Sequence, residues 1–131
     1  MGEINRSIFK AYDIRGKYPD EINEKAVAEI AAVLAGHFKR GKVVIGHDAR
    51  LSSPALYKAA SRSLVISNSL LEIVPIGRCT TPMFYFTARK LKAAGIMITA
   101  SHMPKEFNGL KVVNAKGEVV SGTEIFKLLQ S

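Results

Sequence analysis

The sequence has a single cysteine, no long apolar run and few acidic residues. Because Cys79 has no partner for an internal disulfide, we expect a reducing compartment such as the cytoplasm. No apolar stretch approaches the roughly 20 residues that a membrane-spanning helix needs, so we expect no membrane partner. The first residues lack the apolar stretch of a secretory signal. These features argue against a disulfide-rich secreted protein and against a membrane protein.

The shortage of acidic residues leaves 19 Lys and Arg against 11 Asp and Glu, a formal net charge of +8. This surplus favours anionic partners such as phosphorylated metabolites, although it also serves solubility alone. Basic residues cluster only at 37–42 (HFKRGK), where they complement a helix C-terminus. Because no basic stripe is interleaved with aromatic residues, we expect no nucleic-acid partner.

The chain of 131 residues suits one domain with one core, which we place at 1–131. Several short apolar stretches lack an alternation of apolar and polar residues, which is typical of strands buried on both faces. These expected strands lie at 43–45, 70–74 and 95–100, with further extended segments at 8–16 and 109–120.

Helices are expected between these strands. The first follows the N-cap Asn23, the second opens with Ser53 as N-cap, and the third opens at Thr80 before a proline. A last helix is expected at 121–129. This alternation predicts an α/β fold with three layers, α/β/α, around a mostly parallel, mixed sheet.

In such sheets, ligands bind beyond the carboxyl ends of the strands. Two polar loops are expected at that edge, residues 46–50 (GHDAR) and 99–104 (TASHMP). Ser101 follows a buried strand, and a serine hydroxyl needs a base or a positive field to react. The cations expected nearby are Arg15, Arg50, Lys105 and Lys111. Such a setting suits a serine that carries or receives a phosphoryl group.

Plainer interpretations remain open for each residue alone. Ser101 could hydrogen-bond its own backbone, His102 could be an exposed loop residue, and Lys111 a surface charge at a strand end. Asn108-Gly109 is most simply a turn. A Ser-His-Asp hydrolase is disfavoured because the nucleophile elbow G-x-S-x-G is absent.

Four segments, in order, resemble the α-D-phosphohexomutases, particularly the phosphomannomutase/phosphoglucomutase branch. Residues 99–111 (TASHMPKEFNGLK) resemble the phosphoserine loop of that family, which has a T-[AG]-S-H-N-P core followed by N-G-x-K. The other matching segments are 8–16 (IFKAYDIRG), 44–52 (VIGHDARLS) and 79–83 (CTTPM). One departure is Met103, which replaces the family asparagine and removes an amide from the loop.

The resemblance implies an intramolecular phosphotransferase of the isomerase class. It would interconvert hexose 1-phosphates and hexose 6-phosphates through a hexose 1,6-bisphosphate, which also acts as activator. Ser101 would carry the phosphoryl group, and His102 would assist as acid or base or by ordering the loop. The other implied site residues are the cations Arg15 and Lys111, the bordering Tyr12, and the supporting ion pair Asp48 and Arg50.

The resemblance also implies partners that lie outside this sequence. Enzymes of the family have four domains, and the chain resembles the first, so we expect an N-terminal fragment that is inactive alone. Magnesium would bind the phosphate on Ser101 together with aspartates of another domain. The identity of the hexose stays open between mannose, glucose and glucosamine. The alternatives are a phosphoglucosamine mutase domain and a stand-alone, non-catalytic domain that binds phosphorylated ligands.

Overall fold

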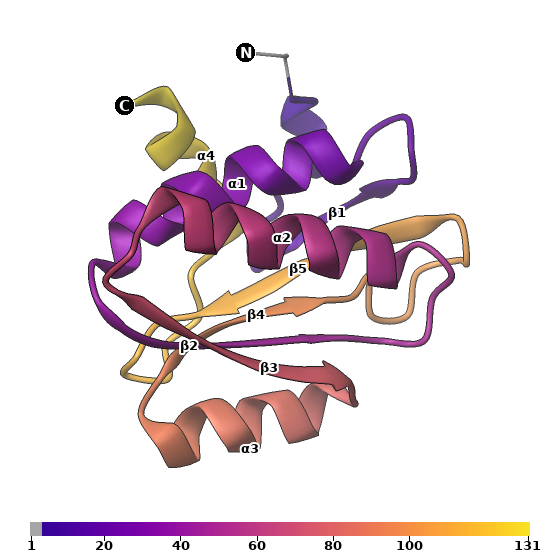
Figure 1. Cartoon of the computed structure of the whole chain (residues 1–131). Coiled ribbons are helices and arrows are strands. Elements are labelled where there is room, and N and C mark those ends of the chain that lie inside the picture. Colours follow the sequence, from indigo (N-terminus) through magenta and orange to yellow (C-terminus); the bar gives the residue numbers. More distant parts are fainter. Residues whose placement is uncertain (1–3) are drawn as a thin grey trace.

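The computed structural model describes residues 4–131, which form a five-stranded mixed sheet with helices on both faces (Figure 1). The order of the strands is β1-β5-β4-β2-β3. The strands are β1 (Ile14–Lys17), β2 (Gly41–His47), β3 (Leu71–Arg78), β4 (Ala94–Ile98) and β5 (Phe107–Val113). The helices are the short 3-10 helix η1 (Arg6–Ile8), α1 (Glu24–Phe38), α2 (Ser53–Ser67), α3 (Thr81–Leu91) and α4 (Gly122–Gln130).

The sheet combines parallel and antiparallel pairs. Strand β2 pairs in parallel with both β3 and β4, whereas β5 runs antiparallel to β4 on one side and to β1 on the other. The predicted α/β fold with a mostly parallel, mixed sheet is therefore confirmed. The carboxyl ends of β2 and β4 lie side by side, at the right-hand edge of the sheet in Figure 1.

The two faces of the sheet are covered unequally. Helices α1, α2 and α4 lie over one face and α3 over the other (Figure 1). Ile45 and Ile98 face the larger core under α1 and α2, whereas Val44 and Met97 pack with Phe84 of α3. Among the described residues, α3 is the helix on its face and packs on β2 and β4. On the same face, Val113 at the end of β5 packs with the α3 cluster, whereas Arg15 and Lys111 lie beyond that helix and are partly exposed. This part of β1 and β5 is called the open face below.

Side-chain caps explain where most helices begin. Asn23 accepts a hydrogen bond from the backbone N–H of Ala26, and Thr80 accepts one from that of Met83, as the sequence predicts. The predicted N-cap Ser53 is wrong. The cap residue of α2 is Ser52, which makes no side-chain cap bond, and Ser53 lies buried in the first helical turn. Its hydroxyl donates to Asp48 and accepts a hydrogen bond from Asn108.

Other boundaries differ because pairing across the sheet overrides local turn signals. Residues 108–109, predicted as a turn, lie inside β5, and Asn108 is fully buried. Strand β3 continues through 75–77. The extended segment predicted at 8–16 is a strand only from Ile14, where β1 begins, and its first residue belongs to the 3-10 helix η1. Strand β4 ends at Ile98, before the predicted end at Ala100. Within residues 4–131, no helix has the length and apolar character required to cross a bilayer.

Candidate functional site

Ser101 occupies an unusual backbone position directly after β4. The N–H of Met103 donates to the carbonyl of Ala100 at 3.1 Å, which closes a tight turn around Ser101. Ser101 has a φ of +58°, in the left-handed region that residues other than glycine seldom adopt. Its N–H donates to Oγ1 of Thr99 at 3.0 Å. Such strained positions concentrate at functional sites, where the surrounding structure imposes them.

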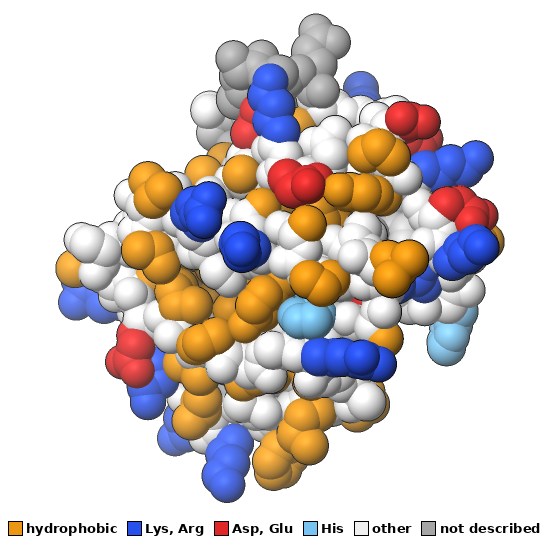
Figure 2. All heavy atoms as spheres, turned by 45° about the vertical axis from the view of Figure 1, so that its right-hand side comes forward, with side chains coloured by type: hydrophobic (Ala, Val, Ile, Leu, Met, Phe, Trp, Pro, Cys, Tyr) orange, Lys and Arg blue, Asp and Glu red, His pale blue; other side chains and the backbone are white. Residues whose placement is uncertain are grey.

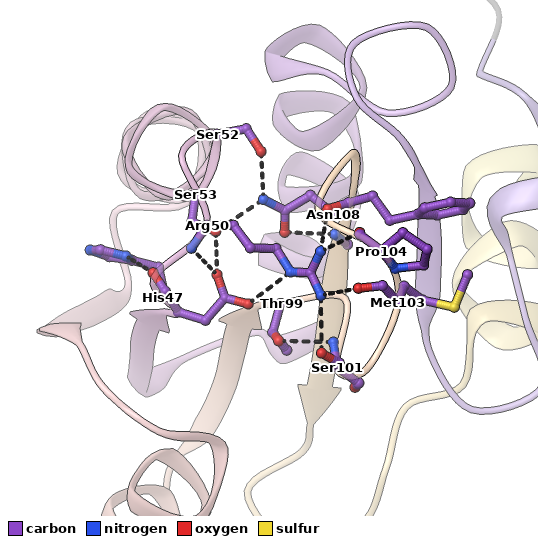
Figure 3. A network of polar contacts seen from close by, with 12 residues as sticks. His47, Arg50, Ser52, Ser53, Thr99, Ser101, Met103, Pro104 and Asn108 are labelled. Atoms are coloured by element: carbon purple, nitrogen blue, oxygen red, sulfur yellow. Dashed lines mark hydrogen bonds and ion pairs between the residues drawn. The ribbon is translucent and has the colours of Figure 1, made fainter.

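Arg50 imposes the conformation of this loop from the neighbouring β2–α2 connection (Figure 3). Its guanidinium donates hydrogen bonds to four main-chain carbonyls, three in the loop at 99–106 (the Ser101 loop) and one at the start of β5. Nη2 contacts the carbonyls of Ser101 at 3.0 Å and Met103 at 2.7 Å. Nη1 contacts those of Pro104 at 2.6 Å and Phe107 at 3.0 Å. The side chain of one arginine therefore holds the loop over most of its length.

Asp48 holds Arg50 in turn and links it to α2. Its Oδ2 lies 3.3 Å from Nε of Arg50, and its Oδ1 accepts from the backbone N–H of Arg50 at 3.1 Å and from the Ser53 hydroxyl. The buried amide of Asn108 donates to the hydroxyls of Ser52 at 2.8 Å and Ser53 at 2.9 Å. This network, visible in Figure 3, joins the β2–α2 loop, the start of α2 and the start of β5. The ion pair expected of Asp48 and Arg50 is present.

The Ser101 loop does not depend on the side chain at position 103. Met103 is held through its N–H, by Ala100, and through its carbonyl, by Arg50. The amide that the sequence lacks at this position is therefore not required for the main-chain bonds of the loop.

The hydroxyl of Ser101 is available for chemistry. The residue is half-buried, and within residues 4–131 its Oγ makes no hydrogen bond, whereas its N–H and carbonyl are both engaged. His102 follows it in the same turn and is exposed. The hydroxyl therefore lies at the carboxyl end of a central strand without a base already bound to it. His102, in the same turn, is one side chain that could act as its acidic or basic partner.

Arg15 and Lys111 are brought together by a residue that sequence reasoning did not single out. Asp13 is buried, and its Oδ1 lies 3.0 Å from Nε of Arg15 while its Oδ2 lies 3.3 Å from Nζ of Lys111. The pairing of Ile14 with Leu110 places Asp13 opposite Lys111 across β1 and β5. The signal for this contact was the alternation Asp13-Ile-Arg15, which places both charges on one face of a strand.

Gly109 connects the Ser101 loop to the cluster of Asp13, Arg15 and Lys111. Its carbonyl accepts from the N–H of Thr99 at 2.9 Å, and on its other side it pairs with Arg15. Arg15 is thus two strand spacings, roughly 10 Å, from the start of the Ser101 loop. Tyr12, beside Asp13 in the chain, is 78% exposed. Lys105 lines a shallow hollow with Asp48, Arg50 and Met103.

The surface on this side mixes apolar and basic side chains. Figure 2 turns the right-hand edge of Figure 1 forward and shows hydrophobic side chains gathered across it, with scattered Lys and Arg between them. Over the described residues as a whole, the exposed large hydrophobic side chains include Tyr12, Leu51, Met83 and Phe86. Asp and Glu side chains are also scattered over this view but cover less of it than Lys and Arg do. The balance of charge on this side therefore favours anionic ligands.

The described residues do not by themselves build a metal site. Across 4–131, no three His, Cys, Asp or Glu side chains are grouped so that they could hold an ion. The carboxylate of Asp13 is engaged by two cations, and that of Asp48 by Arg50 and Ser53. A magnesium ion at this edge would need its carboxylate ligands from elsewhere.

Comparison with known proteins gives one matching family, described as phosphoglucomutase/phosphomannomutase, alpha/beta/alpha domain I, over residues 6–131. A protein of Xanthomonas campestris pv. campestris named phosphohexose mutases is 48% identical over 114 residues, covering 86% of this chain and 25% of that protein. A phosphoglucomutase of Neisseria gonorrhoeae is 38% identical over 133 residues, covering 98% and 28%. A phosphomannomutase of Klebsiella pneumoniae is 38% identical over 115 residues, covering 87% and 72%. The chain thus spans about a quarter of the length of the first two relatives.

Solved structures show the same fold. A phosphoglucomutase/phosphomannomutase family protein of Burkholderia thailandensis superposes with a TM-score of 0.87 at 30% identity, covering 98% of this chain and 30% of that one. A protein of Thermus thermophilus superposes with a TM-score of 0.82 at 31% identity, covering 93% and 29%. In both, the chain corresponds to a part of a larger protein.

Proposed function

Because the chain belongs to the phosphoglucomutase/phosphomannomutase family, as its alpha/beta/alpha domain I, we propose that it is the phosphoserine-bearing domain of a hexose phosphate mutase. Ser101 would be the phosphoryl carrier. The reaction would interconvert hexose 1-phosphate and hexose 6-phosphate through a hexose 1,6-bisphosphate. The names of the relatives support phosphohexoses as the substrate class.

The proposed chemistry has two balanced half-reactions. In the first, a free hydroxyl of the bound hexose phosphate attacks the phosphorus of phosphoserine 101. The bond between phosphorus and Oγ breaks, a bond between phosphorus and the sugar oxygen forms, and the hydroxyl proton ends on Oγ. In the second, Oγ attacks the other phosphate of the bisphosphate and its proton passes to the sugar oxygen that leaves. No net phosphate is consumed.

The observation that carries this proposal is the presentation of Ser101. A half-buried serine with an unengaged Oγ is held in a left-handed turn at the carboxyl end of β4. Arg50 fixes the turn through the carbonyls of Ser101 and Met103. Phosphoryl transfer depends mainly on positioning and on stabilising charge, so a rigidly presented hydroxyl suits it.

The neighbouring side chains supply further parts of the site. Arg15 and Lys111 would bind phosphate oxygens, since both are cations on the open face of β1 and β5. His102 would exchange protons with Oγ or with the sugar hydroxyl, because it lies in the same turn and is exposed. Tyr12 would border the sugar. Asp48 and Arg50 would act on the loop, without touching the substrate.

The rest of the site would come from other parts of a longer protein. This chain offers one ligand for magnesium, the phosphate on Ser101, and the bound ion would supply charge neutralisation at the transferring phosphoryl group. The carboxylate ligands would come from another domain of that longer protein. We therefore expect the isolated chain to bind magnesium poorly and to show no measurable mutase turnover.

The test is mass spectrometry of the native polypeptide that carries TASHMPK, taken from its source cells. We expect one phosphoryl group on Ser101 in a polypeptide longer than this chain. Unmodified Ser101 under conditions of active sugar phosphate metabolism would contradict the proposal. It would favour a domain that only binds phosphorylated ligands. In that case Ser101→Ala would leave the affinity for mannose 1-phosphate unchanged.

A further inference from the structure

Asp13 contacts both of the cations assigned to the phosphate end of the site. Its carboxylate is almost fully buried, with 6% of the side chain exposed, and each oxygen serves a different cation. Oδ1 lies 3.0 Å from Nε of Arg15, and Oδ2 lies 3.3 Å from Nζ of Lys111. The carboxylate therefore bridges side chains from β1 and β5 on the open face of the sheet.

The bridge leaves most of the donors of the cations free. Arg15 uses Nε for Asp13, and neither of its Nη groups donates a hydrogen bond to any group within residues 4–131. Lys111 uses one contact of its ammonium group, which has three N–H donors. A guanidinium edge and an ammonium group held close together match the geometry and charge of a phosphate dianion.

Without a carboxylate between them, the two cations would repel each other. Long side chains such as arginine and lysine also lose considerable rotamer entropy when they are fixed. A buried carboxylate that contacts both at once offsets the repulsion and restricts both side chains before any ligand arrives. This arrangement is costly for stability alone, because the carboxylate must be desolvated and its contacts with two partly exposed cations return only part of that free energy.

We infer that Asp13 is a positioning residue, which holds Arg15 and Lys111 at the spacing needed to bind the phosphate group of the substrate. The inference rests on the proposed function, because it assigns these two cations to a phosphate. It adds a residue whose charge is the opposite of what an anion site would be expected to contain. Asp13 itself would not touch the phosphate.

The direction in which Asp13→Asn changes the affinity for an anion separates a positioning role from a simple effect of charge. If Asp13 acted only through its charge, Asp13→Asn would remove a negative charge beside two cations and would tighten anion binding. If Asp13 positions the cations, the same change weakens binding, because a neutral amide cannot hold both. Asp20→Asn is the matched control, since Asp20 is exposed and the change in net charge is the same.

The experiment titrates inorganic phosphate into the full chain at constant ionic strength and follows the backbone amide signals of Gly109 and Lys111 by NMR. For Asp13→Asn we expect a dissociation constant about tenfold higher than for the wild type, the size of one lost charge-assisted hydrogen bond. For Asp20→Asn we expect a change below about twofold. Unchanged or tighter binding by Asp13→Asn would overturn the inference and leave the proposed function intact.

Two further readouts cover the other outcomes. A wild-type chain that binds no phosphate at these amides would overturn the phosphate site and the inference with it.

If Asp13→Asn fails to fold, Asp13→Glu keeps the charge but moves the carboxylate by one methylene. Wild-type affinity in that variant would overturn positioning, and weaker affinity would support it. In the unliganded wild type, Nε–H of Arg15 should exchange slowly with solvent, and fast exchange would contradict the bridge.

Discussion

Arg50 and Arg15 occupy neighbouring regions of the same sheet edge but use their donors in opposite ways. Every nitrogen of the Arg50 guanidinium has a protein acceptor: Nε contacts Asp48, and the two Nη groups contact carbonyls of the Ser101 loop. Arg15 contacts Asp13 through Nε alone within residues 4–131. A saturated arginine acts as a scaffold, whereas an arginine with free donors can bind a ligand.

The difference also distinguishes the forces in the two regions. The Ser101 loop is held mainly by hydrogen bonds to neutral carbonyls, which are directional and define one backbone shape. The Asp13 bridge joins charges, which tolerate more variation in geometry but depend on the charge state of each partner. We therefore expect the Ser101 loop to lose its conformation when hydrogen-bond donors are removed. The contacts of Asp13 with Arg15 and Lys111 should weaken when one of the charges is removed.

The largest effect is expected from Gly109→Ala, which disturbs both regions at once. A Cβ at this position would lie 1.9 Å from the carbonyl oxygen of Ile14, so β1 must move away from β5. We expect a loss of about 3 kcal/mol in the free energy of unfolding, measured by urea denaturation. Gly36→Ala is the control, because nothing lies within 4 Å of its Cβ, and it should stabilise α1 by about 0.5 kcal/mol. Equal stabilities for the two variants would contradict this account.

Arg50→Ala should disturb the loop region alone. It removes four hydrogen bonds to main-chain carbonyls and leaves Asp48 without its cation, so we expect a loss of about 2 kcal/mol in stability. Hydrogen exchange at the amides of Met103 and Phe107 should accelerate, while Nε–H of Arg15 should stay protected. Arg50→Lys should recover little, because an ammonium group cannot reach the same acceptors. Unchanged exchange in the loop would refute the scaffold role.

Much of this fold could be predicted from the sequence, because local chemistry decides it. The cap at Asn23 and the cap and proline at Thr80 mark helices that the structure contains. The apolar strands without alternation predict a sheet buried between layers, which is observed for β2 and β4. The prediction is wrong for 70–74, because β3 is an edge strand and none of its residues is buried. The loops 46–50 and 99–104 meet at one edge because β2 and β4 are parallel neighbours. The caps and the strand pattern depend on residues close together in the chain, and the meeting of the two loops follows from the parallel sheet that alternating strands and helices predict.

The missed features all depend on distant pairing. Asp13 and Lys111 are 98 positions apart, and only the antiparallel pairing of β1 with β5 places them in contact. Asn108-Gly109 has the composition of a turn, but β1 and β4 on either side incorporate it into a strand. Ser53 resembles an N-cap because its hydroxyl is a good acceptor, yet Asp48 and Asn108 use that hydroxyl instead. Patterns of neighbouring residues could not reveal these distant partners, which replace the hydrogen bonds that a local turn or cap would make.

A smaller effect is expected from the strain at Ser101. At a φ of +58°, the Cβ of a residue other than glycine is in steric conflict with its own backbone. Ser101→Gly removes this strain and should raise the free energy of unfolding by about 0.5–1 kcal/mol. Ser101→Ala keeps the Cβ and should gain nothing. A matched pair of urea denaturation curves measures the difference. Equal stability of the Gly and Ala variants would mean that the loop relaxes and that Arg50 does not impose the conformation.

The smallest effect is expected at Tyr18. This residue makes one hydrogen bond to a neutral carbonyl and one to a charged carboxylate. Its N–H donates to the carbonyl of Glu106 in the Ser101 loop at 2.8 Å, and its hydroxyl donates to the carboxylate of Glu24 at 2.9 Å. The hydrogen bond to Glu24, with smaller contributions from burial and from the repulsion of the Glu24 charge, raises the pKa of Tyr18 above its ordinary value of 10.0. The folded state therefore favours the neutral phenol.

The sign of the pH dependence follows from this shift. The stabilising contribution is fully present below pH 10, where Tyr18 is neutral in both states, and it is lost as the pH rises through the higher pKa of the folded state. Tyr18→Phe should cost about 0.5 kcal/mol or less at neutral pH and should reduce the loss of stability above pH 10 relative to the wild type. Exchange at the amide of Tyr18, corrected for the intrinsic effect of pH, should stay protected because the bond to Glu106 carries no charge. Parallel pH profiles for the two proteins would show that the hydroxyl contact does not stabilise the fold.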